Sequence, residues 1–85
     1  MSSILIKDRV TVLTMDGKTY TDIFPASVQD DMIIIMRHDI SIRRGDKISH
    51  QTPAGVEEIF IVENSRLQSG TEEIPAHYEL RVRRA

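Results

Sequence analysis

The chain has 85 residues, of which 40% are hydrophobic and none is cysteine, and its formal net charge is −2 at pH 7. This composition excludes disulfides and thiolate-ligated zinc, and it lacks the overall basic field that non-specific nucleic-acid binding uses. The length predicts a single β-domain over residues 1–85, and the end of the chain soon after its last expected strand leaves open that this is the N-terminal domain of a longer protein. Missing cysteines, a missing signal peptide and no run of about 20 apolar residues predict a cytoplasmic location without membrane contact.

Residues 1–7 are expected to be a frayed end or a short edge strand. Residues 9–15 and 18–24 then predict a β-hairpin, because Asp16-Gly17 is typical of a two-residue type I′ turn. That turn pairs Val10 with Ile23, and it pairs Val12 with Thr21, on the face expected to point inward.

Pro25 lacks an N–H group and predicts a bend or a sheet edge after the first hairpin. Residues 26–29 and 32–36 predict a second hairpin around Asp30-Asp31, a dipeptide whose short polar side chains suit a turn. Within it, residues 33–35 are three consecutive isoleucines, which indicates a central strand covered on both faces.

The stretch 40–62 predicts a strand, a tight corner at Arg44-Gly45-Asp46, and a long hairpin that turns at residues 53–55. A two-residue or four-residue turn there places Ile48 opposite Ile61, and it places His50 opposite Ile59 on an inner face. A buried imidazole at His50 would need a hydrogen-bond partner.

Residues 63–73 are polar and contain Gly70, so they predict the longest and most mobile loop. Strict alternation follows in residues 76–83 and predicts a strand with one buried face, formed by Ala76, Tyr78, Leu80 and Val82. Together the segments predict an all-β fold: a small six- to seven-stranded antiparallel barrel or sandwich built from consecutive hairpins.

No residue pattern indicates catalysis, a cofactor or a metal. The chain has no Gly-x-Ser-x-Gly elbow, no phosphate-binding glycine loop and no Asp-x-Asp-x-Asp-Gly loop. Its three histidines, His38, His50 and His77, lack the spacing of known metal motifs, so ordinary scattered histidines explain them better. We therefore expect a protein without enzymatic activity, cofactor or metal.

The most informative polar residues are arginines in the middle and at the end of the chain. If the last strand lies near the corner, these residues would form a local positive patch that suits a phosphate backbone or an acidic protein. The simpler explanation, which we favour, is a solvated strand face balanced by nearby glutamates. The candidate binding residues are Arg43, Arg44, Arg81, Arg83 and, on the same strand face as the last two, His77.

Three segments support a resemblance to a known kind of domain. They are the corner Ile42–Ile48, the turn Pro53–Glu58 followed by Val62, and the strand Ile74–Arg83. With these segments the chain resembles a small β-domain of uncharacterised bacterial proteins found in phage-like or mobile-element settings. The hairpin is also similar to the tail-attachment and head-tail connector barrels of phages. The resemblance implies a fold and no active residue.

The function predicted from these observations is a non-enzymatic protein-binding or assembly module, and the resemblance implies that it is derived from a phage. Protein partners, or further copies of the chain, would bind by adding a strand to an exposed sheet edge. The alternative is a small β-barrel that binds nucleic acid through an arginine patch. Scarce aromatic residues and the negative net charge make this alternative the less favoured one.

Overall fold

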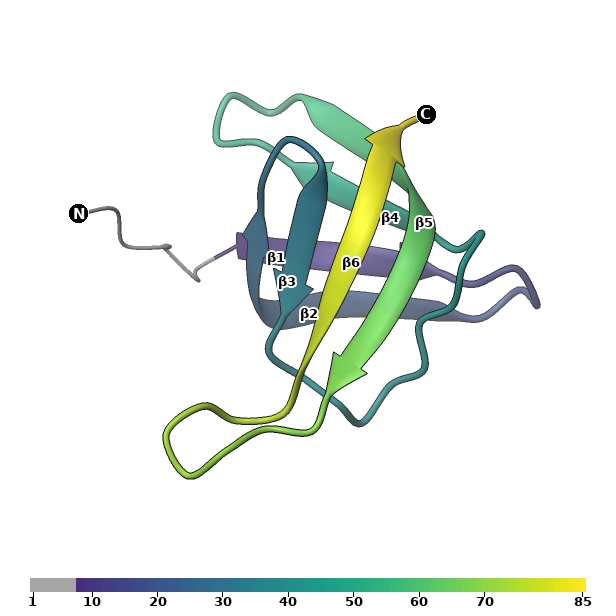
Figure 1. Ribbon diagram of the computed structural model, residues 1–85. Helices are drawn as coiled ribbons and strands as arrows, with labels where there is room; N and C mark the ends of the chain where they lie inside the picture. The colour runs from purple at the N-terminus through teal and green to yellow at the C-terminus, as the bar shows by residue number, and fades with distance from the viewer. Residues whose placement is uncertain (1–7) are drawn as a thin grey trace.

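The protein is a six-stranded antiparallel β-barrel (Figure 1), described here by a computed structural model for residues 8–85. Its order β1-β2-β3-β6-β5-β4 closes because β4 also pairs with β1. The predicted all-β fold is therefore confirmed, as a barrel, while the prediction for residues 1–7 lies outside the described residues. The strands are β1 (Asp8–Leu13), β2 (Thr19–Val28), β3 (Met32–Ile35), β4 (Lys47–Gln51), β5 (Glu57–Gln68) and β6 (His77–Arg84).

The barrel interior is filled by alternate side chains from all six strands, as strand geometry requires. The alternation predicted for the last strand is confirmed, since Tyr78, Leu80 and Val82 are buried there. The hairpin around Asp30-Asp31 is also confirmed, with Ile33 and Ile35 fully buried. The buried apolar core consists of Val10, Val12, Ile23, Ala26, Ile33, Ile35, Ile40, Ile42, Ile48, Phe60, Val62, Tyr78, Leu80 and Val82.

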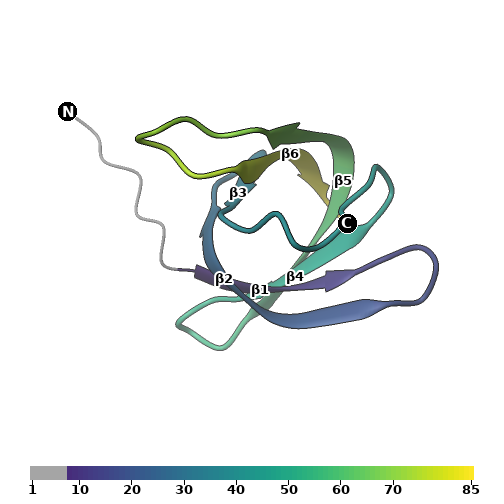
Figure 2. The same ribbon diagram turned by 90° about the horizontal axis from the view of Figure 1, so that it is seen from below.

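One end of the barrel is closed by the segment between β3 and β4, which crosses the opening in Figure 2. The strand predicted before the corner, at residues 40–43, is wrong, because this segment belongs to no strand. It instead inserts Ile40 and Ile42 into the core, and the buried Tyr78 hydroxyl donates a hydrogen bond to the Ile40 carbonyl (2.9 Å). The burial of these two isoleucines at the end of the barrel outweighs the local strand propensity of the segment.

The opposite end is closed by polar side chains on the inner face. His50 pairs in register with Glu58, and its Nδ1 lies 3.2 Å from the Glu58 carboxylate. Its Nε2 lies 3.8 Å from Asp8, and Arg84 reaches Glu58 at 3.1 Å. The prediction that His50 needs a hydrogen-bond partner is thus confirmed, but the partner strand residue is Glu58 and not Ile59.

Both predicted hairpin registers are wrong near their turns by one residue, for the same reason. Thr14 N–H bonds to the Lys18 carbonyl, and Thr52 N–H bonds to the Val56 carbonyl, so each loop has three residues. The third loop residue is a glycine in the left-handed region, at φ +93° for Gly17. Such a loop pairs a type I turn with a glycine bulge, which changes the register by one compared with a two-residue turn.

In the second hairpin this shift exchanges the two faces of β5. Ile48 pairs with Phe60 and not with Ile61, so Phe60 points into the core while Ile61 lies half-buried on the outside. In the first hairpin a bulge in β2 at Asp22, whose φ is +59°, restores the predicted pairing of Val10 with Ile23. Val12, nearer the turn, pairs with Tyr20.

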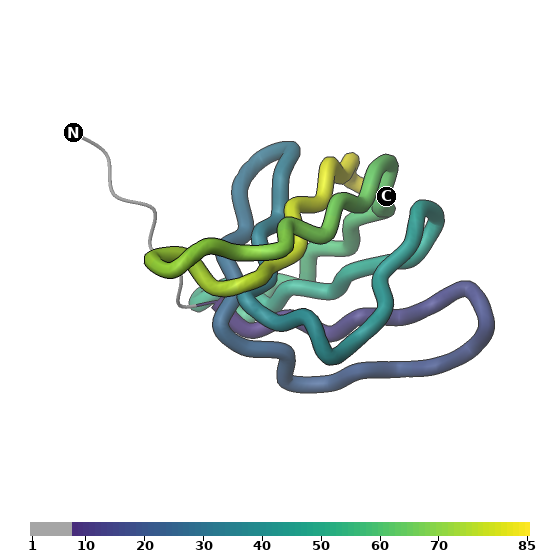
Figure 3. Tube along the Cα trace, turned by 60° about the horizontal axis from the view of Figure 1, so that its bottom comes forward, coloured from purple at the N-terminus to yellow at the C-terminus, as the bar shows by residue number. Residues whose placement is uncertain are grey.

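Two predicted boundaries also differ from the structure. β2 continues through Pro25, which lies at a register shift and so avoids a missing ladder bond. The predicted loop at residues 63–73 is wrong in its first half, because β5 extends to Gln68 and pairs there with β6. Figures 1 and 3 show this β5–β6 hairpin reaching beyond the end of the barrel. The pairing with β6 stabilises a polar sequence that would not form a strand alone.

Candidate functional site

The corner before β4 is held by the side chain of Asp46, which is only 4% exposed. Its two carboxylate oxygens accept hydrogen bonds from the backbone N–H groups of Met15 (3.1 Å) and Arg43 (2.8 Å). Its own backbone carbonyl accepts from Val62 in β5. Asp46 thereby joins three segments that are far apart in the sequence, namely the β1–β2 loop, the corner and β5.

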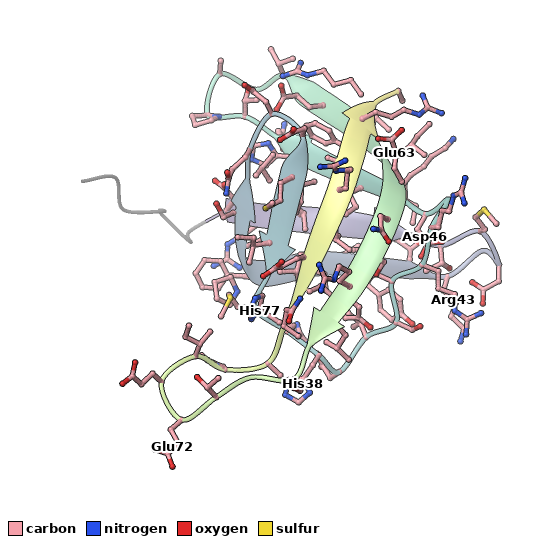
Figure 4. All side chains as sticks on the ribbon, viewed as in Figure 1. His38, Arg43, Asp46, Glu63, Glu72 and His77 are labelled. Carbon is pink, nitrogen blue, oxygen red and sulfur yellow. The ribbon has the colours of Figure 1, made fainter. Side chains whose placement is uncertain are left out.

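A pocket of about 430 Å³ lies between this corner and the β1–β2 hairpin. Figure 4 shows Arg43 and Asp46 together on this side of the barrel. The volume falls in the range of small-molecule sites. Its lining residues are Thr14, Met15, Asp16, Lys18, Tyr20, Ser41, Arg43, Arg44 and Asp46.

The predicted arginines are divided between two places. Arg43 and Arg44 line the pocket, whereas Arg81 and Arg83 lie exposed on the outer face of β6. The Gly45 N–H bonds to the Val62 carbonyl, and Val62 pairs with Val82 of β6. The corner and β6 are therefore one strand apart, which corresponds to about 10 Å between their backbones.

The arginines of β6 have acidic neighbours. Arg83 lies 3.7 Å from Glu63, and Arg84 lies 3.1 Å from Glu58. Arg81 pairs in register with Asn64 and follows Glu79 on the same outer face. Basic and acidic groups thus alternate here, which is the pattern of a solvated strand face.

His77, the remaining predicted site residue, lies where β6 begins, well away from Arg43 (Figure 4). Its Nδ1 lies 3.0 Å from the Pro75 carbonyl, and its Nε2 lies 3.1 Å from a Glu79 carboxylate oxygen. The hydrogen bond to the Pro75 carbonyl and, after it, the Glu79 carboxylate raise the pKa of His77 above 6.5, while burial opposes them. A protonated His77 donates both bonds and so holds the 69–76 loop against β6.

This raised pKa predicts a pH dependence of the loop. Below an unfolded-state pKa of about 6.5 the stabilisation by His77 is fully present, and it is lost as the pH rises through the folded-state pKa. We expect slower amide exchange in residues 70–76 at pH 6 than at pH 8, after correction for intrinsic exchange, and no such difference in His77→Gln. Glu79→Gln should lower the His77 pKa measured by NMR titration. A His77 that titrates at or below 6.5 would contradict the assignment.

A second pocket, of about 530 Å³, lies over the outside of β1 and β4 near His50. Its charged lining groups are Asp8, Asp22, Glu57 and Arg9, and Arg9 is bonded to Asp22 at 3.3 Å. Within residues 8–85, no cluster of three or more histidine or acidic side chains could hold a metal ion. With three carboxylates and one arginine, this pocket presents a mainly acidic surface.

Barrel closure leaves strand edges open only where one strand extends past its neighbour. Between residues 8 and 85, the two longest such stretches are residues 19–24 of β2 and residues 64–68 of β5. The β2 stretch contains a bulge at Asp22 and ends at Pro25, two features that blunt an edge. The β5 stretch is regular, since Asn64 to Gln68 pair without interruption with β6 on their other side.

Backbone direction shows which groups of the β5 stretch face the open side. In β5, a residue whose side chain points into the barrel turns its backbone N–H and C=O groups toward the β4 side, as Val62 does when its N–H bonds to the Asp46 carbonyl. A residue whose side chain points outward turns these groups toward the β6 side, as Ile59 does when its carbonyl accepts from the Ala85 N–H. Ser65 and Leu67 face inward, because they pair with the buried residues Leu80 and Tyr78. Their N–H and C=O groups therefore point to the open side, and the Leu67 side chain is 54% exposed.

The sequence analysis did not identify several residues of the pocket at the corner and of the open edge of β5. It did not associate Lys18 or Tyr20 with the corner, because the Met15–Asp46 bond joins residues 31 positions apart. It assigned residues 64–68 to a loop because only Leu67 among them is apolar. The alternation of Ser65 and Leu67 with polar residues was the one signal available, and it is a weak one.

The comparisons with known proteins give no match, neither to a protein-family model, nor to a curated protein, nor to a solved structure. In the described part of the chain, no helix has the length and apolar character needed to cross a membrane.

Proposed function

We propose that this barrel is a non-enzymatic, cytoplasmic module that binds a protein partner through the open edge of β5, residues 64–68. The observation that carries the proposal is the regular, one-sided backbone of this stretch, which offers unpaired N–H and C=O groups to an incoming strand. The exposed Leu67 adds an apolar contact beside them. The resemblance to phage connector barrels supports looking for the partner in phage-derived assemblies.

The edge of β5 suits strand addition better than the edge of β2. A partner strand needs several consecutive backbone groups in regular spacing, which the bulge at Asp22 disrupts in β2. At the upper end of the β5 stretch, Ser65 Oγ already donates to the Ile42 carbonyl (2.7 Å). That bond uses the side chain of Ser65, so we place the docking register at residues 65–67, where the backbone N–H and C=O groups of Ser65 and Leu67 point to the open side.

The test is affinity capture of the tagged protein from its native cells after nuclease treatment, with wild type, Leu67→Pro and Leu67→Ala compared. Leu67→Pro removes an N–H group that points to the open side and makes no ladder bond to β6, so the barrel should persist. We expect wild type to retain a stoichiometric protein, Leu67→Ala to retain part of it, and Leu67→Pro to lose it.

Circular dichroism and thermal unfolding of the purified variants would confirm that both are folded. Equal recovery of the partner by Leu67→Pro and wild type would refute strand addition at this edge. Recovery that disappears on nuclease treatment would instead favour the nucleic-acid alternative. Sedimentation of the purified wild type at increasing concentration would show whether the partner is a second copy of the chain.

A further inference from the structure

We propose that the pocket between the β1–β2 hairpin and the corner binds a small molecule that carries a phosphate group. This inference goes beyond the protein-binding edge at residues 64–68, which contains none of the residues that line the pocket. It rests on the charges of the pocket, on how its acids are bonded, and on its size and walls.

The pocket contains three basic side chains without an acidic partner. Within residues 8–85, ion pairs involve Arg9, Arg37, Arg83 and Arg84 together with two histidines, but none involves Lys18, Arg43 or Arg44. All three of these last residues line the one pocket. Guanidinium groups offer forked N–H donors that match phosphate oxygens, and lysine adds a point charge.

The two acids of the pocket are occupied by local hydrogen bonds. Asp46 is buried and accepts from two backbone N–H groups. Asp16 accepts through one oxygen from the Thr14 hydroxyl and the Lys18 N–H, bonds that keep the pKa of Asp16 below its usual value. The formal charges of three basic and two acidic side chains leave one excess positive charge in the pocket.

The volume of the pocket and its lining residues indicate a ligand larger than a single phosphate ion. A volume of about 430 Å³ is that of a small-molecule site. Tyr20, half-buried against the core, offers a ring to a flat group, and Ser41 offers a hydroxyl. A nucleoside monophosphate has both parts, a phosphate for the basic groups and a base for the ring.

The side chains of Arg43 and Arg44 can be replaced without removing a hydrogen bond that holds the corner. Arg43 holds the corner through its backbone N–H, which bonds to Asp46, and not through its side chain. Replacing both guanidinium groups therefore leaves the Asp46 bonds in place. The chain also offers a matched control, because Arg81→Gln with Arg83→Gln removes the same charge from the outer face of β6.

The experiment is an NMR titration of the ¹⁵N-labelled protein with adenosine monophosphate, inorganic phosphate, adenosine and glutamate, at fixed ionic strength. We expect shift changes at residues 14–20 and 41–46, with adenosine monophosphate binding more tightly than phosphate or adenosine. Each guanidinium lost should weaken its binding about tenfold or more, so Arg43→Gln/Arg44→Gln should weaken it strongly. The β6 control should change it less than about twofold.

Three results would overturn the proposal. The first is no saturable shift change at these residues with any phosphate-bearing probe. The second is equal weakening by the pocket variant and the β6 control, which would indicate only a general charge effect. The third is glutamate binding as tightly as adenosine monophosphate, which would make the pocket a carboxylate site. Unchanged spectra away from the pocket confirm that each variant is folded, and none of these results depends on the β5 edge.

Discussion

Replacing Asp46 with alanine is expected to lower the free energy of unfolding by about 3 kcal/mol, a large part of the stability of so small a domain. The change leaves the backbone N–H groups of Met15 and Arg43 without their acceptors, and it opens a void in a site that is only 4% exposed. Urea denaturation followed by circular dichroism measures the loss.

The control for this variant is Asp16→Ala, in the β1–β2 loop to which Asp46 bonds. It removes the same charge and also removes hydrogen bonds, but Asp16 is exposed, so water replaces the lost partner. We expect a clearly smaller loss of stability than for Asp46→Ala. Equal losses of stability in the two variants would show that Asp46 stabilises the protein through its charge alone and not through the hydrogen bonds by which it joins three segments. A folded Asp46→Ala protein should also have lost the pocket between hairpin and corner.

Gly70→Ala is the second substitution with a large expected effect, again about 3 kcal/mol of unfolding free energy. Gly70 has φ +82°, and an added Cβ would lie 2.6 Å from the backbone nitrogen of Ala76 and 3.0 Å from the Ile74 carbonyl oxygen. Backbone atoms cannot turn aside as a flexible side chain can. The β5–β6 loop must therefore change its course, which weakens the hairpin that bears the proposed docking edge.

Gly55→Ala isolates the conformational part of this cost. Gly55 has a similar φ of +85°, but an added Cβ would meet no atom within 4 Å. We expect Gly55→Ala to cost about 1 kcal/mol, from the left-handed backbone alone. Thermal unfolding of the two variants distinguishes the cost of the left-handed backbone, present in both, from the cost of the steric clash, present only in Gly70→Ala. A Gly70→Ala protein no less stable than Gly55→Ala would contradict the close approach at Ala76.

The local patterns identified most strands of this protein. Val10, Val12 and Ile23 share a core face as predicted, and the alternation from Tyr78 to Val82 is as it was predicted. The hairpin around Asp30-Asp31 also agrees with the structure. These features depend on side-chain periodicity and on turn chemistry, which act over a few residues.

The main error in the sequence prediction was the strand register of the two hairpins, because register depends on the exact number of loop residues. Asp16-Gly17 and Ala54-Gly55 are compatible with either a two-residue or a three-residue turn. The two-residue turn exchanges the faces of β5 and places Phe60 on the face opposite Ile48, whereas the structure pairs Phe60 with Ile48 in the core. Nothing local distinguishes the two turns, whereas the packed barrel does, since only one of them buries Phe60.

The candidate site was predicted in part. Arg43 and Arg44 do line a pocket, but the sequence could not show that Lys18 and Tyr20 complete it. Arg81 and Arg83 lie one strand away on a face that also carries Glu63 and Glu79. Which basic groups meet depends on strand order and on side-chain direction, and both arise from long-range pairing.

By itself, the sequence determined that this is a cysteine-free, all-β domain with turns at the glycines and an apolar face on most of its strands. Only the tertiary structure decided that the sheet closes, that Ile40 and Ile42 fill one end, and that β5 extends past its neighbour. The physical reason is the range of the interactions. Periodicity and turns are local properties of the chain, whereas closure, end-filling and open edges arise from contacts between residues distant in sequence.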